Sequence, residues 1–307
     1  MALDAGLDVK EILLVGNQNE IAKILSANGP VDSRLKIIHA EHVLTMDESP
    51  VSALRQKKDT SIARAVELVK QGQADALVSP GNTGSVVASS AISLRTIPGV
   101  ERPAIATTMP SASGKYILLD AGANVDCRPE HLLHFAVMGS LYASIILGKP
   151  EPRVGLINVG TEDCKGNKLV QATFKLLRQS GLNFVGNVES HDLFAGRVEV
   201  AVCDGFVGNV FLKTVESTAH MILSAFQGEP PSNALIKLKG RMDPDNFGGA
   251  PLLGVNGIVI IAHGSSREKA ILNAIRGAAE TVRHDLRHKI ESAVEQVNRS
   301  VMATPQA

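Results

Sequence analysis

The sequence predicts an α/β protein, with a three-layer α/β/α arrangement around a mostly parallel, Rossmann-like sheet. Short apolar runs of four to six residues recur along the chain, and longer amphipathic stretches separate them. The runs are rich in Val, Ile and Leu and do not alternate with polar residues, as expected of strands that helices cover on both faces. Regular alternation of strands with helices favours a parallel sheet.

Each element follows from a local pattern. Strands are expected at Ile12–Val15, Lys36–His39, Ala76–Ser79, Tyr116–Asp120, Val154–Val159, Val198–Cys203 and Ile258–Ala262. Helices are expected at Thr60–Gln71, Gly84–Leu94, Glu130–Leu147, Lys168–Ser180, Gly208–Phe226 and Ser266–Arg287. Pro129 and Glu130 mark a helix start, and Gly148 follows the last turn of that helix. Gly72 and Gly181 end two others in the same way.

The N-terminus departs from this regular pattern. Leu3–Ala5 predicts the start of a further strand, yet the strand at Ile12 begins only six residues later. Two neighbouring parallel strands need a crossover of about a dozen residues or more. We therefore expect that these two strands are not neighbours, or that a segment is lacking between them.

The chain is predicted to form a single α/β/α catalytic domain over residues 1–307. Residues 226–241 are expected to be an exposed connection, because Gln227–Asn233 combines glycine, two prolines, serine and asparagine. Residues 266–301 are expected to be a C-terminal helical region. Its narrow apolar stripe of Ile290, Val294 and Val297 suits a partner helix and favours a dimer.

Composition excludes several classes of protein. Lys and Arg number 31, as do Asp and Glu, and only 3% of residues are aromatic, which argues against nucleic-acid binding. No apolar run reaches the ~18 residues of a membrane span, and no signal peptide is visible. The three cysteines form no C-x-x-C pair, which excludes a zinc finger and a disulfide framework. We expect a soluble, cytoplasmic protein without a cofactor or a metal.

Polar residues follow five of the predicted strands. Ligands of an open parallel sheet collect at the carboxyl ends of its strands. The segments concerned are Pro80–Gly84, Asp120–Asp126, Gly160–Asn167, Asp204–Asn209 and His263–Ser266, with Lys213 one helical turn beyond Asn209. Glycine lets backbone amides approach an anion, a helix N-terminus adds positive charge, and Lys supplies a cation for phosphate. The five loops together therefore predict an oxyanion or phosphate site.

A plainer interpretation stays open for each loop, because Gly, Asn, Asp and Ser are also the ordinary residues of turns and helix caps. Asp120 and Asp204 are either site residues or caps, and His263 is either a site residue or a structural one. Cys203 is expected to be a packed thiol. His131 and His134 lie three apart on a predicted helix, without a glutamate pattern that would complete a metal site. The dinucleotide fingerprint, the P-loop and the serine-hydrolase elbow are absent from the sequence.

Taken in order, the loops resemble the PlsX-type phosphate acyltransferases. The matching stretches are Met46–Pro50, Lys57–Ile62, Ser79–Gly84, Leu119–Cys127, Cys203–Asn209, Gly248–Gly254 and Ala262–Ser266. The resemblance implies a fold similar to phosphotransacetylases and to isocitrate and isopropylmalate dehydrogenases. It implies transfer of a fatty acyl group from acyl-[acyl carrier protein] to inorganic phosphate, giving acyl phosphate for phospholipid synthesis. It also implies a homodimer and peripheral association with the inner face of the membrane.

Two stretches depart from the family pattern. The family continues its first strand into a Met-Gly-Gly-Asp turn and a helix, whereas here Ala5 passes directly to Gly6–Asp8. The family also has a longer apolar and basic helical hairpin where this chain has the short stretch between Phe226 and Arg241.

On this resemblance each site residue receives an expected role. Phosphate is expected at the amides of Gly81, Thr83 and Gly84 and of Gly264, Ser265 and Ser266, with Lys165 or Lys213. The thioester carbonyl or the pantetheine amides are expected at Asn82, Asn124, Asn167 or Asn209, with Asp120 and Asp204 nearby. His263 is expected to protonate the leaving thiolate, so Lys213, His263 and Asn82 are the predicted catalytic residues. Arg55, Lys57 and Lys58 are expected to contact the acidic carrier protein.

Two other functions remain open. A phosphotransacetylase acting on acyl-CoA would share the phosphate site but prefer a donor that carries adenine. A non-catalytic scaffold would bind the carrier protein without phosphate-dependent loss of the thioester. A dehydrogenase rests on fold analogy alone.

Overall fold

The α/β architecture is confirmed. The computed structural model describes residues 3, 5–44, 59–226, 232–243, 245 and 248–302. Within these residues, eight strands form one sheet and two form a separate small sheet. In spatial order the large sheet contains β3 (Ala76–Ser79), β10 (Ile258–Ile261), β9 (Ala250–Leu253), β4 (Ala104–Ser111), β5 (Gly114–Leu119), β8 (Val200–Val202), β6 (Val154–Ile157) and β7 (Phe184–Val188). Apart from the strand start at Leu3–Ala5, the seven strands expected from the sequence are present, whereas β4, β7 and β9 were not expected.

The direction of the strands changes in the middle of the sheet. β5, β8, β6 and β7 pair in parallel, and so do β10 and β3. The pairings of β10 with β9, β9 with β4, and β4 with β5 are antiparallel. Three reversals mean that β3 and β10 run opposite to β5, β8, β6 and β7. The carboxyl ends of the two parallel groups therefore open at opposite edges of the sheet.

Helices cover both faces of the sheet. The helices are α1 (Gln18–Ala27), α3 (Ser61–Lys70), α4 (Thr83–Ser93), α5 (Pro129–Ile146), α6 (Lys168–Gln179), α7 (Ser190–Ala195), α8 (Gly205–Ala225), α9 (Asn233–Met242), α10 (Glu268–Arg283) and α11 (Leu286–Met302). Ala104, Ala106 and Leu119 pack with α5 on one face, where α10 also lies. Their strand neighbours Ile105 and Leu118 point to the other face, toward α3 and α4 or toward α7 and α8. The alternation is the period of two expected of strands between two helical layers.

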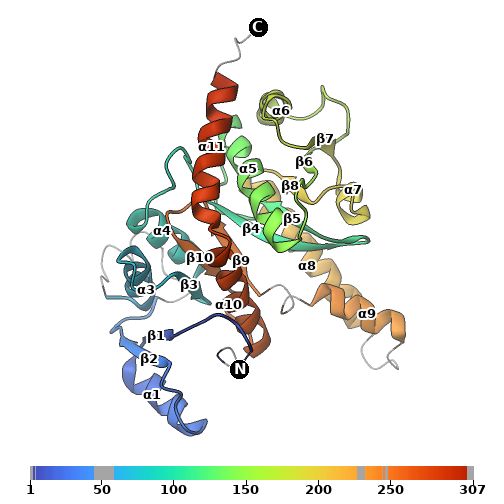
Figure 1. Ribbon diagram of the computed structural model, residues 1–307. Coiled ribbons are helices and arrows are strands. Elements are labelled where there is room, and N and C mark those ends of the chain that lie inside the picture. The colour runs from blue at the N-terminus through green and yellow to red at the C-terminus, as the bar shows by residue number, and fades with distance from the viewer. Residues whose placement is uncertain are drawn as a thin grey trace.

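The C-terminal helical region differs from its expectation in one respect. The helix predicted to run on to Arg287 stops at Arg283, Asp285 takes a left-handed conformation, and α11 follows. The stripe of Ile290, Val294 and Val297 is buried in the main hydrophobic core beside α5, as Figure 1 shows for the two helices. The dimer inferred from that stripe is therefore not supported, because the stripe already has its partner within the chain.

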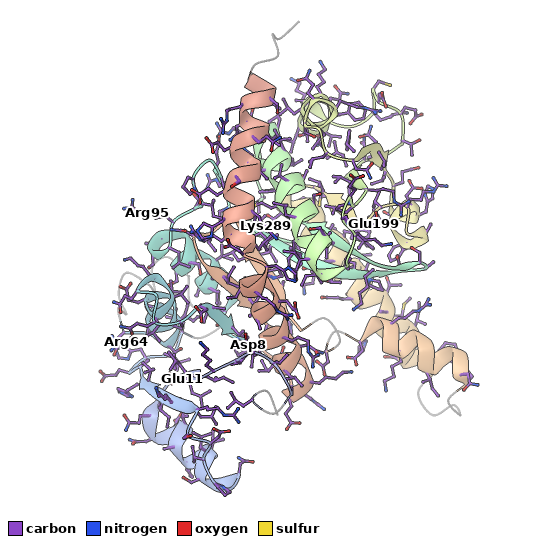
Figure 2. The ribbon with its side chains drawn as sticks, in the orientation of Figure 1. Asp8, Glu11, Arg64, Arg95, Glu199 and Lys289 are labelled. Atoms are coloured by element: carbon purple, nitrogen blue, oxygen red, sulfur yellow. The ribbon has the colours of Figure 1, made fainter. Side chains whose placement is uncertain are left out.

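The N-terminal segment forms a unit beside the main sheet (Figure 1). β1 (Ile12–Gly16) and β2 (Leu35–His39) pair in parallel, with α1 between them. Glu11, labelled in Figure 2, precedes β1 and forms an ion pair with Lys36. Leu3, Ala5 and Gly6 lie in turns, so the strand expected there is not observed at the described residues. The suspected conflict between two closely spaced parallel strands does not arise.

The region expected to be a connection contains a helix. α8 and α9 lead away from the sheet (Figure 1), and α9 begins within residues 226–241, which were expected to be an exposed connection. Residues 227–231 of that stretch lie outside the described residues. No helix in the described ranges is long and apolar enough to cross a membrane.

Candidate active site

The first group of predicted site residues lies at the carboxyl ends of β3 and β10. The backbone N–H of Ala262 donates to the Ser79 carbonyl oxygen at 2.9 Å, which brings the two following loops side by side. Asn82 caps α4 by accepting a hydrogen bond from the Ser85 N–H at 2.9 Å. A Cβ at position 81 would lie 3.1 Å from the Ile62 side chain, so glycine fits this turn best. The backbone N–H groups in the first turn of α4 have no partner within the helix, and the helix dipole adds partial positive charge there.

His263 lies in the neighbouring loop and is exposed to solvent. Its Nδ1 atom lies 2.7 Å from the Ser265 hydroxyl and 3.2 Å from the Ser265 backbone nitrogen. An Nδ1 atom that accepts the backbone N–H leaves the proton of a neutral ring on Nε2. His263 is therefore held through Nδ1 by its own loop, and its Nε2–H donor faces solvent.

The second group lies at the carboxyl ends of β5 and β8, around the fully buried Asp120. Its carboxylate accepts backbone hydrogen bonds from Ile105, Gly122, Ala123 and Asn124, and one more from the Asn124 side chain. Burial raises the pKa of Asp120, and these donors oppose that rise. Asp120 therefore holds the loop together, and its side chain faces inward rather than toward a substrate.

Asn124 has a similar structural task. Its side-chain amide donates to the Pro103 carbonyl oxygen at 2.7 Å and to Asp120 at 2.9 Å, which uses both amide hydrogens. Asp204 caps α8 by accepting from the Val207 N–H at 2.9 Å. The capping interpretation of Asp204 thus holds in this structure. A substrate-binding role for Asn124 stays a prediction that requires one of its bonds to break.

The start of α8 is packed against the Asp120 loop. The Gly205 N–H donates to the Asn124 carbonyl oxygen at 2.7 Å, and a Cβ at position 208 would overlap the Asp120 carbonyl oxygen. Asn209 lies above Gly122, where an added Cβ would approach its side chain to 3.4 Å. Asn209 is exposed, and its side chain makes no hydrogen bond within the described ranges. Among the residues of this group, Asn209 is the best placed to meet a ligand.

The two predicted lysines lie in ion pairs at the surface. Lys213 Nζ lies 2.8 Å from a Glu216 oxygen, and 57% of the lysine side chain is exposed. Lys165 Nζ lies 4.0 Å from Glu162 on the loop after β6, where Asn167 caps α6 through the Val170 N–H. Exposed pairs of this kind hold their partners weakly. Either lysine would have to leave its glutamate to bind phosphate.

The two groups of loops share a face of the sheet rather than an edge. Ile62, which lies beneath Gly81, belongs to the same hydrophobic cluster as Ala121, the residue after Asp120. Leu212 of α8 packs against that cluster and also against the cluster around Leu118. Because β4 and β9 reverse the sheet, the five predicted loops divide between its two edges. α4 and α8 instead flank the same face.

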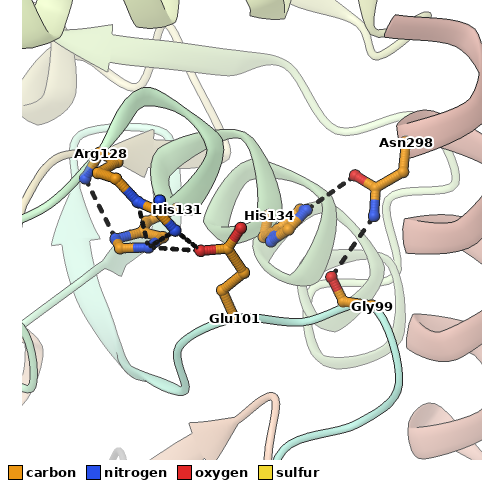
Figure 3. Close-up of polar contacts among 6 residues, drawn as sticks. All are labelled: Gly99, Glu101, Arg128, His131, His134 and Asn298. Carbon is orange, nitrogen blue, oxygen red and sulfur yellow. Dashed lines mark hydrogen bonds and ion pairs between the residues drawn. The ribbon is translucent and has the colours of Figure 1, made fainter. Parts of the chain in front are cut away.

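Sequence reasoning missed one polar cluster near the second group. Glu101, Arg128 and His131 meet where α5 begins, and His134 contacts Asn298 of α11 one turn further on (Figure 3). Both histidines are buried. Their spacing of three residues was noted in the sequence, but the glutamate lies thirty residues earlier and gives no local signal. Within the described ranges, no group of three or more possible ligands is placed to hold a metal.

The cysteines beside the Asp120 loop are held as thiols. Burial raises the pKa of Cys203, and burial together with Asp120 raises the pKa of Cys127 to about 11. A raised pKa opposes the thiolate form that nucleophilic attack requires. Arg55, Lys57 and Lys58 lie outside the described residues.

Comparison with known proteins identifies the family. A family model described as fatty acid synthesis protein matches residues 4–289. The phosphate acyltransferase of Desulforamulus reducens is 52% identical over 295 residues, which cover 92% of this chain and 88% of the relative. That of Desulforudis audaxviator is 49% identical over 290 residues, covering 90% and 85%. The chain belongs to the phosphate acyltransferase family.

This phosphate acyltransferase also shares its fold with solved transferases. A phosphotransacetylase from Streptococcus pyogenes superimposes with a TM-score of 0.64 at 21% identity, covering 89% of this chain and 86% of that one. The EutD phosphotransacetylase from Staphylococcus aureus gives a TM-score of 0.56 at 17% identity, covering 92% and 97%. At these identities the likeness shows the fold alone. The predicted fold class and the predicted enzyme class, an acyltransferase, are both confirmed.

Proposed function

We propose that this phosphate acyltransferase moves a fatty acyl group from acyl-[acyl carrier protein] to inorganic phosphate, and that the acyl phosphate feeds phospholipid synthesis. The main support is that the loops after β3 and β10 are joined by the hydrogen bond between Ala262 and Ser79. The loop after β3 leads into the N-terminus of α4, which lies within the residues that the family model matches. Such a helix end binds phosphate through backbone N–H groups and helix dipole. The match to a fatty acid synthesis family supports a fatty acyl donor.

Phosphate is assigned to the first turn of α4 and to the loop from His263 to Ser266. A phosphate oxygen attacks the thioester carbon, a C–O bond forms, and the carbonyl electrons move onto oxygen. When the tetrahedral intermediate collapses, the C–S bond breaks and the thiolate leaves with its electron pair. The protein contributes mainly position and stabilisation of the oxyanion, since phosphate is itself the nucleophile. No covalent acyl-enzyme is needed.

Individual side chains have defined tasks in this proposal. His263 is exposed beside this phosphate-binding loop, and in its imidazolium form it gives a proton to the leaving thiolate and becomes a neutral ring. Lys213 adds positive charge after it leaves Glu216, and Asn209 offers its amide to the thioester or the pantetheine arm. Arg55, Lys57 and Lys58 are proposed to contact the carrier protein.

The donor is tested by comparing palmitoyl-[acyl carrier protein] with palmitoyl-CoA at equal concentration. We expect at least a tenfold higher kcat/KM for the carrier-protein donor. Equal or better use of palmitoyl-CoA would favour the phosphotransacetylase-like alternative. Lys57→Ala and Lys58→Ala together should raise KM for the carrier-protein donor alone, whereas Lys175→Ala, an exposed lysine of α6, serves as the control.

We also propose a homodimer formed through α8. Only Gly205 and Gly208 of this 21-residue helix are buried. Large apolar side chains are exposed along it, and a groove of about 330 Å³ lies between α7 and α8. The exposed members are Phe206, Val207, Val210, Met221 and Ile222. An apolar surface of this extent marks a contact site, and a second copy of the chain presents the same helix in return.

Sedimentation equilibrium at micromolar concentration tests the dimer. Met221→Glu should shift the protein to the monomer, whereas the neighbouring exposed His220→Glu should not. If the wild type is a monomer and binds phosphatidylglycerol vesicles through α8, the dimer is contradicted. The exposed face of α8 would then be a site of peripheral membrane association.

A further inference from the structure

Two chain segments lie alongside one another at the second group of site loops. The segment from Glu101 to Ile105 meets the loop from Asp120 to Arg128 at three successive levels. Ile105 N–H donates to Asp120 at 3.0 Å, and the Asn124 amide donates to Pro103 at 2.7 Å. At the far end Glu101 meets Arg128 and His131. The first two contacts fix the beginning and middle of the loop, and the last joins its end, where Arg128 caps α5, to Glu101.

The chemistry of that last contact is well defined (Figure 3). His131 Nδ1 accepts the backbone N–H of Arg128 at 3.1 Å, so the ring carries its proton on Nε2. Nε2 lies 3.0 Å from a Glu101 carboxylate oxygen, to which the Arg128 guanidinium also donates. His131 is only 4% exposed, whereas Glu101 and Arg128 reach the surface. A buried imidazole thus aligns an exposed ion pair at the start of α5.

The far side of the same loop holds α8. The Asn124 carbonyl oxygen accepts the Gly205 N–H at 2.7 Å, and Asn209 lies above Gly122. A loop that shifts at its Arg128 end would therefore change the position of the first turn of α8. Asn209, which carries the exposed side-chain amide of this group, directly follows that turn in α8.

We propose that Glu101 and His131 are positioning residues for acyl transfer, which hold the end of the Asp120–Arg128 loop and thereby place Asn209. This inference rests on the proposed function, in which the loop and Asn209 receive the acyl donor. Phosphate binds at the other group of loops, after β3 and β10. We call the contact of Glu101 with Arg128 and His131 the clamp. Loss of the clamp should therefore reduce kcat and leave KM for phosphate almost unchanged.

The test compares two glutamates that each bind an arginine. Glu101→Gln removes the charge from the clamp, and Glu199→Gln does the same for the pair with Arg153 at the starts of β6 and β8. Glu199, labelled in Figure 2, precedes the amino end of β8, whereas the Asp120 loop follows the carboxyl end of the neighbouring parallel strand β5. We expect Glu101→Gln to lower kcat at least tenfold and to speed amide hydrogen exchange of residues 121–128 at least tenfold. Glu199→Gln should lower the melting temperature and change neither quantity.

A second pair of variants separates positioning from packing. His131→Gln retains an N–H donor toward Glu101 and should keep at least half of the wild-type kcat, whereas His131→Leu should behave like Glu101→Gln. Wild-type kcat in Glu101→Gln, or unchanged exchange at residues 121–128, would overturn the inference. If the wild type itself shows no phosphate-dependent transfer, the proposed function fails, and the exchange comparison alone still decides whether the clamp holds the loop.

Discussion

The Asp120 carboxylate accepts two hydrogen bonds from Asn124, one from its backbone N–H at 2.7 Å and one from its side-chain amide at 2.9 Å. The remaining oxygen accepts three more backbone N–H groups. A residue at the carboxyl end of a buried strand, which invites a catalytic interpretation, here organises the loop that follows it.

Asp120→Asn should therefore destabilise the protein strongly. The NH2 end of the asparagine amide would face backbone N–H donors, and some of these buried N–H groups would lose their acceptor. We expect a loss of about 3 kcal/mol in the free energy of unfolding, the range for breaking a buried charged network. Urea denaturation measures it. A loss below about 1 kcal/mol would show that the loop does not depend on this carboxylate.

Gly208→Ala should disturb the contact between α8 and the Asp120 loop. The added Cβ would overlap the Asp120 carbonyl oxygen, which is backbone and cannot rotate away. Gly277→Ala in α10 is the matched control, because nothing lies within 4 Å of its Cβ position. We expect the control to be neutral or to gain up to about 1 kcal/mol from helix propensity. A Gly208→Ala protein as stable as the control would contradict the close contact.

Asn82→Asp tests where phosphate binds. Aspartate caps a helix as well as asparagine does, so α4 should remain intact while a negative charge appears beside the cradle. For Asn82→Asp we expect at least a tenfold rise in KM for phosphate, which would bind beside this residue at the first turn of α4, and an unchanged melting temperature. Asn17→Asp, at the N-cap of α1, is the control. Equal KM values in both variants would remove phosphate from the first turn of α4.

The free energy of unfolding should depend on pH through the Glu101–His131 contact. Burial lowers the pKa of His131 more than Glu101 raises it. The unfolded chain therefore binds a proton near pH 6.5 that the folded chain resists, and stability falls as the pH drops below about 6.5. The hydrogen bond from His131 and the charge of Arg128 lower the pKa of Glu101 despite its burial, and that contribution is lost only at lower pH, as Glu101 is protonated.

Melting temperatures of the wild type and His131→Gln check this sign. The difference between the two proteins should be largest near pH 8 and should shrink at pH 5.5, because the variant cannot lose stability through this proton. A difference that stays constant between the two pH values would show that His131 does not titrate with folding.

The strands that could be predicted are those with continuous apolar runs. β10 reads Ile-Val-Ile-Ile, and β5 ends in Ile-Leu-Leu. β4 consists largely of alanine and threonine with Pro110, and β9 is a four-residue strand that contains Pro251, so neither carries that signal. Their antiparallel pairing is what reverses the sheet. For that reason the sequence indicated the site loops as candidates, but not that they divide into two groups.

The roles of individual residues were harder to predict, because they depend on contacts between distant segments. Asn124 binds Pro103, and His131 binds Glu101, across 21 and 30 residues respectively. The apolar stripe that includes Val294 was visible in the sequence, but no local pattern distinguishes a partner in α5 from a partner in another chain.

The central claim is tested most directly by the release of free carrier-protein thiol from palmitoyl-[acyl carrier protein], with and without phosphate. We predict thiol release only when phosphate is present, accompanied by an equal amount of palmitoyl phosphate. Release at the same rate without phosphate, or no release by a folded protein that binds the carrier, would contradict the proposed acyl transfer.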